Sequence, residues 1–381
     1  MCFCSDGLKG IDAKMIKVLY LLNHAGKAGT ERYVQTLIQK LKDKKIEPYF
    51  AYNEDGLLVK RLESMGINTY RIKMRNPFDI RAVLELSRLC RKLGIQVIHT
   101  QFLRENYIAL LSRIINPKVR VIYTNHFILE NKAVIRLTNK LITPLQSRII
   151  AVCNKGKDMM ISNGVNAKKI RVIFNGVDTR HWGEPIKSTI REEFGIDADC
   201  FVLFCASRFA HDKGHRFLID ALKELKDDAG FNFKCILSGD GPLLEESQKQ
   251  AKELELSEHI IFTGFRKDMK NLIYGSDLYI NSSEHEALSF LIIEVLACGI
   301  PVIATDMGGN SDIINEQTNC GLLVQYNNPK ELAGAIAKVL GDQRLRMLFG
   351  ENARKAVKEK FNLDKVVQQT YNLYKESLGR A

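Results

Sequence analysis

Two acidic side chains, Glu286 and Glu294, lie eight residues apart at the start of an apolar segment with helical character. Eight residues of helix span about 12 Å along the axis. The two carboxylates of a glycosidase lie roughly 5 to 9.5 Å apart, so these two acids are poorly placed to act together on one glycosidic bond. They are better placed to hold the two ends of one extended ligand.

The start of this helix adds a second chemical feature. The first N–H groups of a helix have no partner within it, so the backbone at Leu288, Ser289 and Phe290 is a predicted seat for a phosphate. A nucleotide-sugar has hydroxyl groups at both ends and a diphosphate in the middle, which suits this arrangement. A helix-start acid and an acid on a solvated helix face would give the same two residues, and that alternative stays open on spacing alone.

A glycine-containing loop follows the first predicted strand and runs directly into a helix. It reads His24-Ala-Gly-Lys-Ala-Gly-Thr-Glu31, and Gly29 would let backbone N–H groups approach an anion at the helix start. Neither the Gly-x-Gly-x-x-Gly pattern of dinucleotide-binding proteins nor a Walker loop is present in the sequence. Their absence disfavours simple dinucleotide and NTPase interpretations.

Short β-branched runs alternate with amphipathic stretches along the chain, and the series occurs twice. This pattern predicts an α/β protein with two doubly wound parallel sheets, each covered on both faces. Domains of this kind bind ligands beyond the carboxyl ends of their strands, so we expect the ligand in a cleft that the two domains face. The predicted strands cover residues 17–22, 47–52, 97–100, 119–124, 147–152 and 170–173, and then 201–206, 234–238, 260–263, 278–280, 301–305 and 321–324.

The predicted domain boundaries follow from this repetition. Residues 1–14 lack the layout of a signal peptide and are predicted to be a disordered lead-in. The polar, aperiodic stretch 178–188 is the predicted linker. It separates an N-terminal Rossmann-like domain over 15–182 from a C-terminal one over 183–360. The helical pattern in 361–381 predicts a helix that docks back near the N-terminal domain.

Composition limits the class of protein. With 45% hydrophobic and 26% charged residues, the 381-residue chain is an ordinary globular protein, and disordered and fibrous classes are excluded. No apolar run approaches the roughly 18 to 20 residues of a membrane-spanning helix. The nine cysteines are an odd number, and several lie in strand-like runs, which indicates a reduced, cytoplasmic setting.

The net charge of +12 is unevenly distributed. Residues 1–185 have 32 Lys and Arg against 15 Asp and Glu, a charge of +17, and the remainder has a charge of −5. A basic surface attracts phosphates, anionic lipids or nucleic acid. Because the chain has no zinc finger, no basic helix with heptads and no aromatic-interleaved RNA-binding pattern, nucleic acid is not a predicted partner.

The segment from Glu130 to Arg148 mixes cations with apolar residues. If it is helical, it could lie in a membrane interface with its cations on lipid phosphates. It could equally pack its apolar face on a core. The sequence leaves both alternatives open, and with them a peripheral contact with an anionic membrane.

Several motifs follow one another in a fixed order over residues 15 to about 360. Glu286-x7-Glu294 is followed by Ala-Cys-Gly-Ile-Pro-Val-Ile-Ala over 297–304. Together with their neighbours, they resemble the signature of the family 4 retaining glycosyltransferases, the group 1 transferases with the GT-B fold. The other elements similar to that family are Ala28-Gly-Thr-Glu-Arg32, Val172-Ile-Phe-Asn-Gly-Val-Asp178, Arg208-x4-Lys213-Gly214, Gly239-Asp-Gly-Pro-Leu243 and Phe262-Thr-Gly-Phe265.

The resemblance implies a GT-B fold with an acceptor-binding domain over 15–182 and a nucleotide-sugar-binding domain over 183–360. It also implies a role for individual residues. It places Arg208 and Lys213 on the donor diphosphate, where two fixed cations would stabilise the negative charge of the leaving group. It places Glu294 on ribose hydroxyls and Glu286 on the sugar, where Glu286 would help to stabilise an oxocarbenium-like state. His126 lies in an element similar to the family's Thr-x-His and would orient a sugar hydroxyl.

The chain departs from the family's pattern at three places. The family often has Glu-Gly-Phe-Gly where this chain has Glu286-Ala-Leu-Ser289, a change that keeps the backbone donors. Ala28 replaces a usual glycine in the first loop. Many members have a second histidine two residues after the position of His99, where this chain has Gln101, so His99 is given no catalytic role.

The expected activity is retaining transfer of a hexose or N-acetylhexosamine from a UDP-sugar, or a GDP-sugar, to an acceptor hydroxyl in lipopolysaccharide, exopolysaccharide or glycolipid synthesis. The acceptor would be a glycan or lipid-linked, at the cytoplasmic face of the membrane. No cofactor is predicted. Asp197-Ala-Asp199 matches the Asp-x-Asp of metal-dependent transferases of the other major fold, but it precedes a strand in a turn-like stretch, so no essential metal is predicted. The alternatives are a nucleotide-sugar epimerase or hydrolase of the same fold and a non-catalytic sugar- or anion-binding protein.

Overall fold

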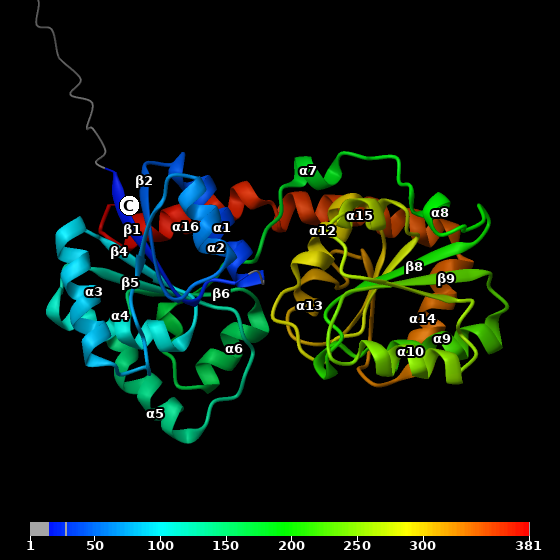
Figure 1. Ribbon diagram of the computed structural model, residues 1–381, viewed down its shortest axis with the longest axis horizontal. Coiled ribbons are helices and arrows are strands. Elements are labelled where there is room, and N and C mark those ends of the chain that lie inside the picture. The colour runs from blue at the N-terminus through cyan, green and yellow to red at the C-terminus, as the bar shows by residue number, and fades with distance from the viewer. Residues whose placement is uncertain (1–14, 27–28, 381) are drawn as a thin grey trace, which may run out of the picture. The chain divides into compact units, whose positions relative to one another are not determined.

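The computed structural model describes residues 15–26 and 29–380, so the predicted lead-in over 1–14 lies outside the described residues. Two parallel sheets are present, and helices lie between their strands along the chain (Figure 1). Both sheets were predicted from the alternation of short apolar runs and amphipathic stretches. The structure confirms this pair of doubly wound sheets.

The first sheet has seven strands. In chain order they are β1 (Ile16–His24), β2 (Ile46–Glu54), β3 (Asn68–Arg71), β4 (Val97–Thr100), β5 (Arg120–Asn125), β6 (Arg148–Ala151) and β7 (Ile170–Val172). Across the sheet their order is β3-β2-β1-β4-β5-β6-β7. The direction of winding therefore reverses between β1 and β4, which are parallel neighbours.

The second sheet has six strands. They are β8 (Phe201–Ala206), β9 (Phe233–Ser238), β10 (Ile260–Gly264), β11 (Leu278–Asn281), β12 (Val302–Thr305) and β13 (Gly321–Val324). Their order is β10-β9-β8-β11-β12-β13, and all five pairings are parallel. The winding reverses between β8 and β11, at the position that corresponds to β1 and β4 in the first sheet.

Helices connect the strands. The α-helices of five residues or more are α1 (Gly29–Lys42), α2 (Leu57–Ser64), α3 (Ile80–Leu93), α4 (Leu103–Ile115), α5 (Ala133–Ile142), α6 (Asn154–Ser162), α7 (Thr179–Gly183), α9 (His215–Ala229), α10 (Leu244–Glu253), α11 (Met269–Tyr274), α12 (Phe290–Cys298), α14 (Pro329–Gly341), α15 (Gln343–Lys360) and α16 (Leu363–Ser377). Across the described part of the chain, none is long and apolar enough to cross a membrane.

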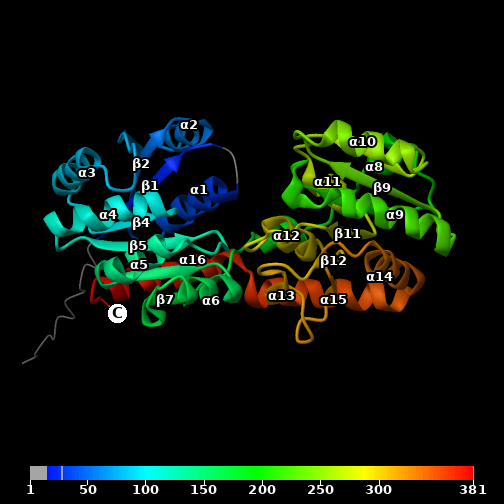
Figure 2. The same ribbon diagram turned by 90° about the horizontal axis from the view of Figure 1, so that it is seen from below.

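Alternate residues of β8 enter two separate hydrophobic clusters, one on each face of the second sheet. Val202 and Phe204 pack with residues of α11, α12 and α15, whereas Leu203 and Cys205 pack with residues of α9 and α14. Figure 2 shows α9 lying between α10 and α14. The central strands are thus buried on both faces, as parallel strands usually are.

The first sheet is also covered on both faces. Leu19 and Leu21 of β1 pack against α3 and α4. On the opposite face, the hydroxyl of Tyr20 accepts a hydrogen bond from Tyr374 of α16 (3.4 Å), and Tyr374 also bonds Nδ1 of His99 on β4 (2.6 Å). The last helix of the chain is therefore tied to the first strand.

The chain forms two compact units. One comprises Met1–Thr124, Ile142–Ile149 and Thr370–Ala381, and the other comprises Asn125–Leu141 and Ile150–Gln369. The stretch 178–188, the predicted linker, contains the short helix α7, whose Trp182 is buried in a core cluster with α12.

Candidate functional site

The reversal of strand order between β8 and β11 determines where a ligand of the second unit would bind. In doubly wound sheets, ligands lie beyond the carboxyl ends of the two strands at which the order reverses. The loop over 207–214 follows β8, and the loop over 282–289 follows β11. These two loops contain Arg208, Lys213 and Glu286, so the fold brings together three residues that are 78 positions apart in the sequence at most.

Four charged side chains alternate in sign across these loops. Arg208 Nη2 lies 3.8 Å from Asp212 Oδ1, and Lys213 Nζ lies 3.6 Å from Asp212 Oδ2. Lys213 Nζ also donates a hydrogen bond to Glu286 Oε1 at 2.9 Å. We call Arg208, Asp212, Lys213 and Glu286 the charge chain. Because both cations approach Asp212, Arg208 and Lys213 lie close enough to act on a single anion.

The members of the charge chain differ in exposure. The Lys213 and Glu286 side chains are 19% and 18% exposed, whereas that of Arg208 is 67% exposed. Ion pairs that solvent still reaches contribute little to stability, of the order of 1 kcal/mol or less. A ligand phosphate could therefore replace a carboxylate as the partner of either cation at small cost.

The backbone around Lys213 is held in place by the neighbouring loop. Ser282 Oγ donates to the Lys213 carbonyl (3.0 Å), and the Glu284 N–H donates to the Asp212 carbonyl (2.9 Å). Gly214 has a φ of 65°, and a Cβ there would lie 2.0 Å from the Ser282 carbonyl oxygen. Only glycine permits this turn and this close approach, which together fix Lys213 just before α9.

Glu286 is fixed in a similar way by the turn after β12. Gly308 has a φ of 57°, and a Cβ on it would lie 1.4 Å from the Glu286 carbonyl oxygen. Ser283 Oγ donates a hydrogen bond to Glu286 Oε1 at 3.3 Å. The acid therefore has a positioned backbone and two side-chain donors, Ser283 and Lys213.

The predicted phosphate seat lies at the start of α12. The helix begins at Phe290, two residues later than the sequence suggested, because Ser289 is the N-cap and its Oγ accepts the Ile292 N–H at 3.4 Å. The Leu288 carbonyl accepts a hydrogen bond from Asn175 Nδ2 at 3.0 Å. Leu288 and Ser289 are thus the last loop residues, and Phe290 is the first residue of the helix.

Glu294 lies within α12 and is 2% exposed. It is surrounded in sequence by residues of the core cluster on that face of the sheet, including Ile293 and Val295. The structure therefore separates the two acids of the motif: Glu286 belongs to the charge chain, and Glu294 is buried in the helix that follows it.

His126 follows β5 and belongs to the same compact unit as the charge chain. It is half-buried, and burial lowers its pKa to about 3. The imidazole is consequently neutral at physiological pH and can orient a hydroxyl by hydrogen bonding. Two residues later, Ile128 packs against the core cluster that contains Leu288, and its Cδ1 is 3.4 Å from where a Cβ of Gly308 would be.

Gly29, the remaining predicted contact, is the first residue of α1 and lies in the other compact unit. Ala28, just before it, is outside the described residues. On the same loop, the Gly26 N–H donates to Glu31 Oε1 at 3.1 Å. The part of Gly29 in ligand binding stays a prediction.

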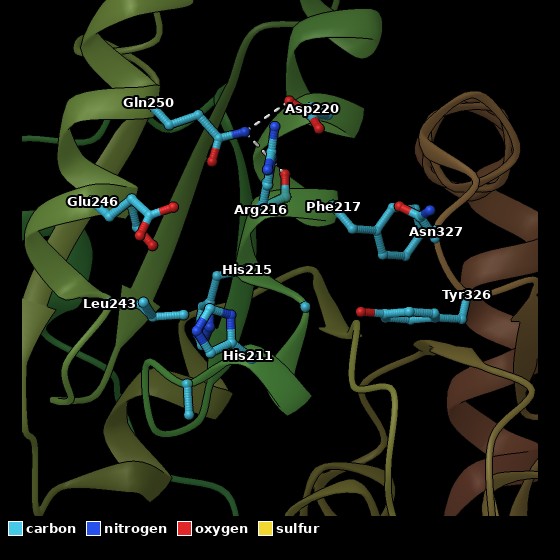
Figure 3. A pocket seen from close by; sticks show the side chains of 13 residues that line it. His211, His215, Arg216, Phe217, Asp220, Leu243, Glu246, Gln250, Tyr326 and Asn327 are labelled. Atoms are coloured by element: carbon cyan, nitrogen blue, oxygen red, sulfur yellow. Dashed lines mark hydrogen bonds between the residues drawn. The ribbon is translucent and has the colours of Figure 1, made fainter.

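A cavity of about 480 Å³ lies at the start of α9, beside α10 and the residues that follow β13 (Figure 3). None of the predicted site residues lines it. His215 does, and its burial together with the nearby Lys213 charge lowers the pKa of His215 to about 4. The neutral ring stacks on Phe209 with 4.0 Å between the ring centroids, and Arg216 supplies a positive charge to the lining of the cavity.

Within residues 15–26 and 29–380, no group of three or more His, Cys, Asp and Glu side chains is arranged to hold a metal ion. Asp197 and Asp199 are exposed in a turn before β8, where the Cys200 N–H donates to the Asp197 carbonyl at 3.2 Å.

Two residues with a clear part in the site were missed by the sequence analysis. Asp212 approaches both cations, and its position four residues after Arg208 was the available signal. Asn175, 3% exposed, holds the loop before α12, although the sequence assigned its motif only a turn.

Two family models match this chain. Residues 28–181 match the model of Glycosyltransferase Family 4, and residues 186–356 match that of Glycosyl transferases group 1. The two matches together cover most of both parallel-sheet domains.

Two curated relatives cover most of the chain. It is 23% identical over 327 residues to the N-acetyl-alpha-D-glucosaminyl L-malate synthase of Bacillus anthracis, with 82% of this chain and 83% of the relative aligned. It is 26% identical over 362 residues to a Campylobacter jejuni enzyme, with 90% and 95% aligned. That enzyme is the N-acetylgalactosamine-N,N'-diacetylbacillosaminyl-diphospho-undecaprenol 4-alpha-N-acetylgalactosaminyltransferase.

Among solved structures, the fold is similar to that of Anabaena HepE, crystallised in complex with UDP. The TM-score is 0.85 at 22% identity, and the match covers 95% of this chain and all of the other. With the two doubly wound parallel sheets, this likeness identifies the fold as GT-B.

Proposed function

Because the chain belongs to the group 1, family 4-like glycosyltransferases, we propose that it transfers a hexose or N-acetylhexosamine from a UDP-sugar to an acceptor hydroxyl with retention of the anomeric configuration. The observation that carries the proposal is the charge chain. Two cations and two acids lie on the loops that follow β8 and β11, where a doubly wound sheet binds its ligand.

The two cations bind the donor diphosphate. Lys213 exchanges its bond to Glu286 Oε1 for a phosphate oxygen, and Arg208 turns from Asp212 to a second oxygen. As the bond between the sugar and the β-phosphate breaks, negative charge accumulates on that phosphate, and fixed cations stabilise it. In this proposal the pair supplies the charge that a metal ion supplies in other transferases, so the reaction needs no metal.

The start of α12 adds backbone donors to the same phosphate. The first N–H groups of a helix carry a partial positive charge and point at an anion placed before them. The Ser289 cap and the Asn175 bond to the Leu288 carbonyl hold this backbone, so the donors are positioned before the ligand arrives.

Glu286 contacts the transferred sugar. Once Lys213 turns to the phosphate, the Glu286 carboxylate keeps its bond from Ser283 and is available to a sugar hydroxyl or to the positive charge of an oxocarbenium-like state. His126, neutral at pH 7, orients another hydroxyl without supplying a proton. The proton of the acceptor hydroxyl passes to a phosphate oxygen of the departing UDP, so no side chain has to act as the base.

Glu294 binds the ribose hydroxyls of the donor in this assignment. Since its side chain is 2% exposed here, the contact requires a neighbouring side chain to move when the nucleotide enters. We expect the nucleotide to bind by such an adjustment.

For the acceptor, we propose a lipid-linked or phosphorylated glycan that the enzyme reaches as a peripheral protein at the cytoplasmic membrane face. The name of the Campylobacter jejuni relative specifies a diphospho-undecaprenol acceptor, which supports this choice, whereas that of the Bacillus anthracis relative specifies malate. The charge of +17 in residues 1–185 favours a phosphorylated acceptor.

The test measures nucleotide affinity and turnover separately. Glu294→Gln is expected to weaken UDP binding by about tenfold or more. Arg208→Ala is expected mainly to slow turnover, measured as the formation of UDP from the UDP-sugar in the presence of an acceptor. Glu351→Gln, an exposed change on α15, is the matched control. Equal affinity and equal rate in both site variants would contradict these assignments.

The acceptor dependence of the reaction separates this proposal from its rivals. Consumption of the donor at the same rate without any acceptor would indicate an epimerase or a hydrolase. Nucleotide binding without consumption of any UDP- or GDP-sugar, with malate and lipid-linked glycans both offered as acceptors, would indicate a binding protein.

A further inference from the structure

We infer that α5 and the segment before it form a docking surface for a lipid bilayer with anionic headgroups. The inference rests on the proposed function, because it says where the enzyme would meet the membrane that holds its lipid-linked acceptor. Its test measures membrane binding and does not require turnover. The surface consists of five apolar side chains that are 51 to 77% exposed, which we call the α5 surface: Phe127, Leu129, Val134, Leu137 and Leu141.

Helix α5 exposes its apolar side and buries a polar residue, the reverse of a helix that packs on a core. Val134, Leu137 and Leu141 are three and seven residues apart and therefore form one stripe, and they are 77%, 60% and 70% exposed. Asn139, an amide, is the residue of α5 that is buried. A helix that packs on a core buries its apolar stripe, so this stripe is directed at something other than the rest of the protein.

Hydrogen bonds hold the helix in this orientation. Asn139 Nδ2 donates to the Asn163 carbonyl at 3.1 Å, and Asn163 Oδ1 accepts the Asn131 N–H at 2.8 Å. Asn163 Nδ2 donates in turn to the Leu129 carbonyl at 2.8 Å. One asparagine at the end of α6 thus positions both the helix and the segment before it, and the apolar stripe is presented in a fixed direction.

Gly164 adds a steric requirement. Its φ is 85°, and a Cβ there would lie 2.7 Å from the Arg136 carbonyl oxygen. The glycine permits α5 to approach α6 closely through its polar side, which leaves the apolar side outward.

Cations lie along one edge of the stripe. Lys132, Arg136 and Lys140 are exposed, and Glu130, 3.7 Å from Arg136, is the one acid in residues 125–141. On a helical projection, Arg136 and Lys140 lie between the stripe and the side that carries Asn139. This is the distribution expected of a helix at a membrane interface, where apolar side chains enter the acyl region and cations meet lipid phosphates.

The helix is the right length to lie on a bilayer and too short to cross one. Its ten residues span about 15 Å, half of a hydrocarbon core.

A second copy of the chain is the other occupant to consider. In a symmetric dimer the same patch meets itself, so the cationic edges of two copies would enter one interface with a single acid on each side. The charge of the edge therefore favours an anionic surface over a second copy.

The experiment measures binding of the full chain to vesicles by flotation. One set of vesicles is phosphatidylcholine alone, and the other contains about one-third phosphatidylglycerol. The wild type is expected to float with the anionic vesicles and to dissociate at high salt. The variant Val134→Ser/Leu137→Ser/Leu141→Ser is expected to lose at least about 100-fold in affinity, because three apolar side chains no longer enter the bilayer.

The charge variant Arg136→Gln/Lys140→Gln separates the two contributions. Each cation near an anionic surface is worth about fivefold in affinity, so the pair is expected to lose about 25-fold on anionic vesicles and little on neutral ones. The control Met347→Ser/Leu348→Ser removes two exposed apolar side chains of α15 and should bind as the wild type does.

Insertion can be followed directly with Leu137→Trp. The chain has one tryptophan, Trp182, which is 7% exposed, so a new indole at 137 reports the environment of the α5 surface. Its emission should shift to the blue on anionic vesicles, and brominated lipid should quench it.

The proposal is overturned if the wild type ignores anionic vesicles, or if the triple serine variant binds them as well as the wild type does. A wild type that is dimeric and a serine variant that is monomeric, with no vesicle binding by either, would assign the surface to a second copy. UDP binding is measured on the same variants and should be unchanged. A failure of vesicle binding therefore leaves the donor assignment intact, and a failure of nucleotide binding leaves the α5 surface intact.

Discussion

The two places where strand order reverses share a topology but differ in chemistry. Between β8 and β11 the following loops present charged side chains that pair with one another: Lys213 with Glu286, and both Lys213 and Arg208 with Asp212. Next to the reversal between β1 and β4, by contrast, two buried carboxylates accept hydrogen bonds from backbone N–H groups. Glu31 accepts from the Gly26 N–H, and Glu105, fully buried, accepts from the Phe102 N–H at 3.0 Å.

The charged side chains of the charge chain can exchange one another for a ligand, whereas the buried carboxylates near β1 and β4 cannot give up their hydrogen bonds without a cost. An ion pair at partial exposure costs little to open, because water or a ligand replaces each partner. A buried polar group that loses its hydrogen bond costs about 1 to 3 kcal/mol. The topology therefore fixes where a ligand can bind, and the burial of the polar side chains decides whether they serve the ligand or the fold.

The largest expected effect is at the second reversal point. Lys213→Ala should lower turnover by about 100- to 1000-fold, since the leaving phosphate loses a fixed cation, while the free energy of unfolding changes by about 1 kcal/mol or less. UDP release and urea unfolding measure the two quantities. Lys338→Ala, an exposed change on α14, is the control. A stability loss of several kcal/mol with unchanged turnover would show that Lys213 supports the fold and not the reaction. It would contradict the contrast between the two reversal points.

The next effect, on stability rather than on turnover, is expected at the reversal between β1 and β4. Burial raises the pKa of Glu105 to about 8, so the folded protein keeps this acid protonated where the unfolded chain ionises it. Stability is then lost as pH rises from about 4.5 to 8. Glu105→Gln should raise the free energy of unfolding by up to about 4 kcal/mol at pH 9 and by little at pH 4.5.

Urea unfolding at the two pH values measures this difference, with Glu351→Gln as the exposed control. If Glu105→Gln stabilises equally at both pH values, ionisation of Glu105 is not what opposes folding at high pH.

The smallest effect concerns His215, beside Lys213. Because the pKa of His215 is about 4 in the folded protein, its imidazole takes up a proton near pH 6.5 in the unfolded chain but stays neutral in the folded protein. Stability therefore falls as pH drops below 6.5, by about 1 kcal/mol between pH 7.5 and 6. His215→Gln should remove that slope, measured by thermal unfolding across this range. His211→Gln, exposed on the same loop, should keep it, and a slope that survives His215→Gln must come from another group.

The sequence predicted most of the fold because the central strands are buried on both faces and read as apolar runs. The strand at Phe201–Ala206 was predicted to the residue. The edge strand β3 was missed, because Asn68-Thr-Tyr-Arg71 is polar and its two ends are exposed. This edge strand lacks the apolar signal on which such predictions rest, whereas the edge strands β7, β10 and β13 have it and were predicted.

The site was predicted as far as residue types and spacing reach. The motif grouped Glu286 with Glu294, but only the packing of α12 shows one of them in the charge chain and the other 2% exposed. Asp212 approaches two cations, Arg208 and Lys213. Its position four residues after Arg208 was a signal, but a weak one, because Arg208 does not lie in a helix. Residues 130–148 left two orientations open, since periodicity says that a helix has an apolar side but not which way that side points.

The hydrogen bonds of Tyr374 have a consequence for biosynthesis. Tyr374 bonds to His99, 275 residues earlier in the chain, and to Tyr20, 354 residues earlier. A ribosome completes the first sheet long before it makes this tyrosine, so the nascent first sheet lacks the hydrogen bonds of Tyr374 to Tyr20 and His99 until Tyr374 has been made. A premature stop before codon 374 would thus remove two hydrogen bonds from the part of the protein that was made first.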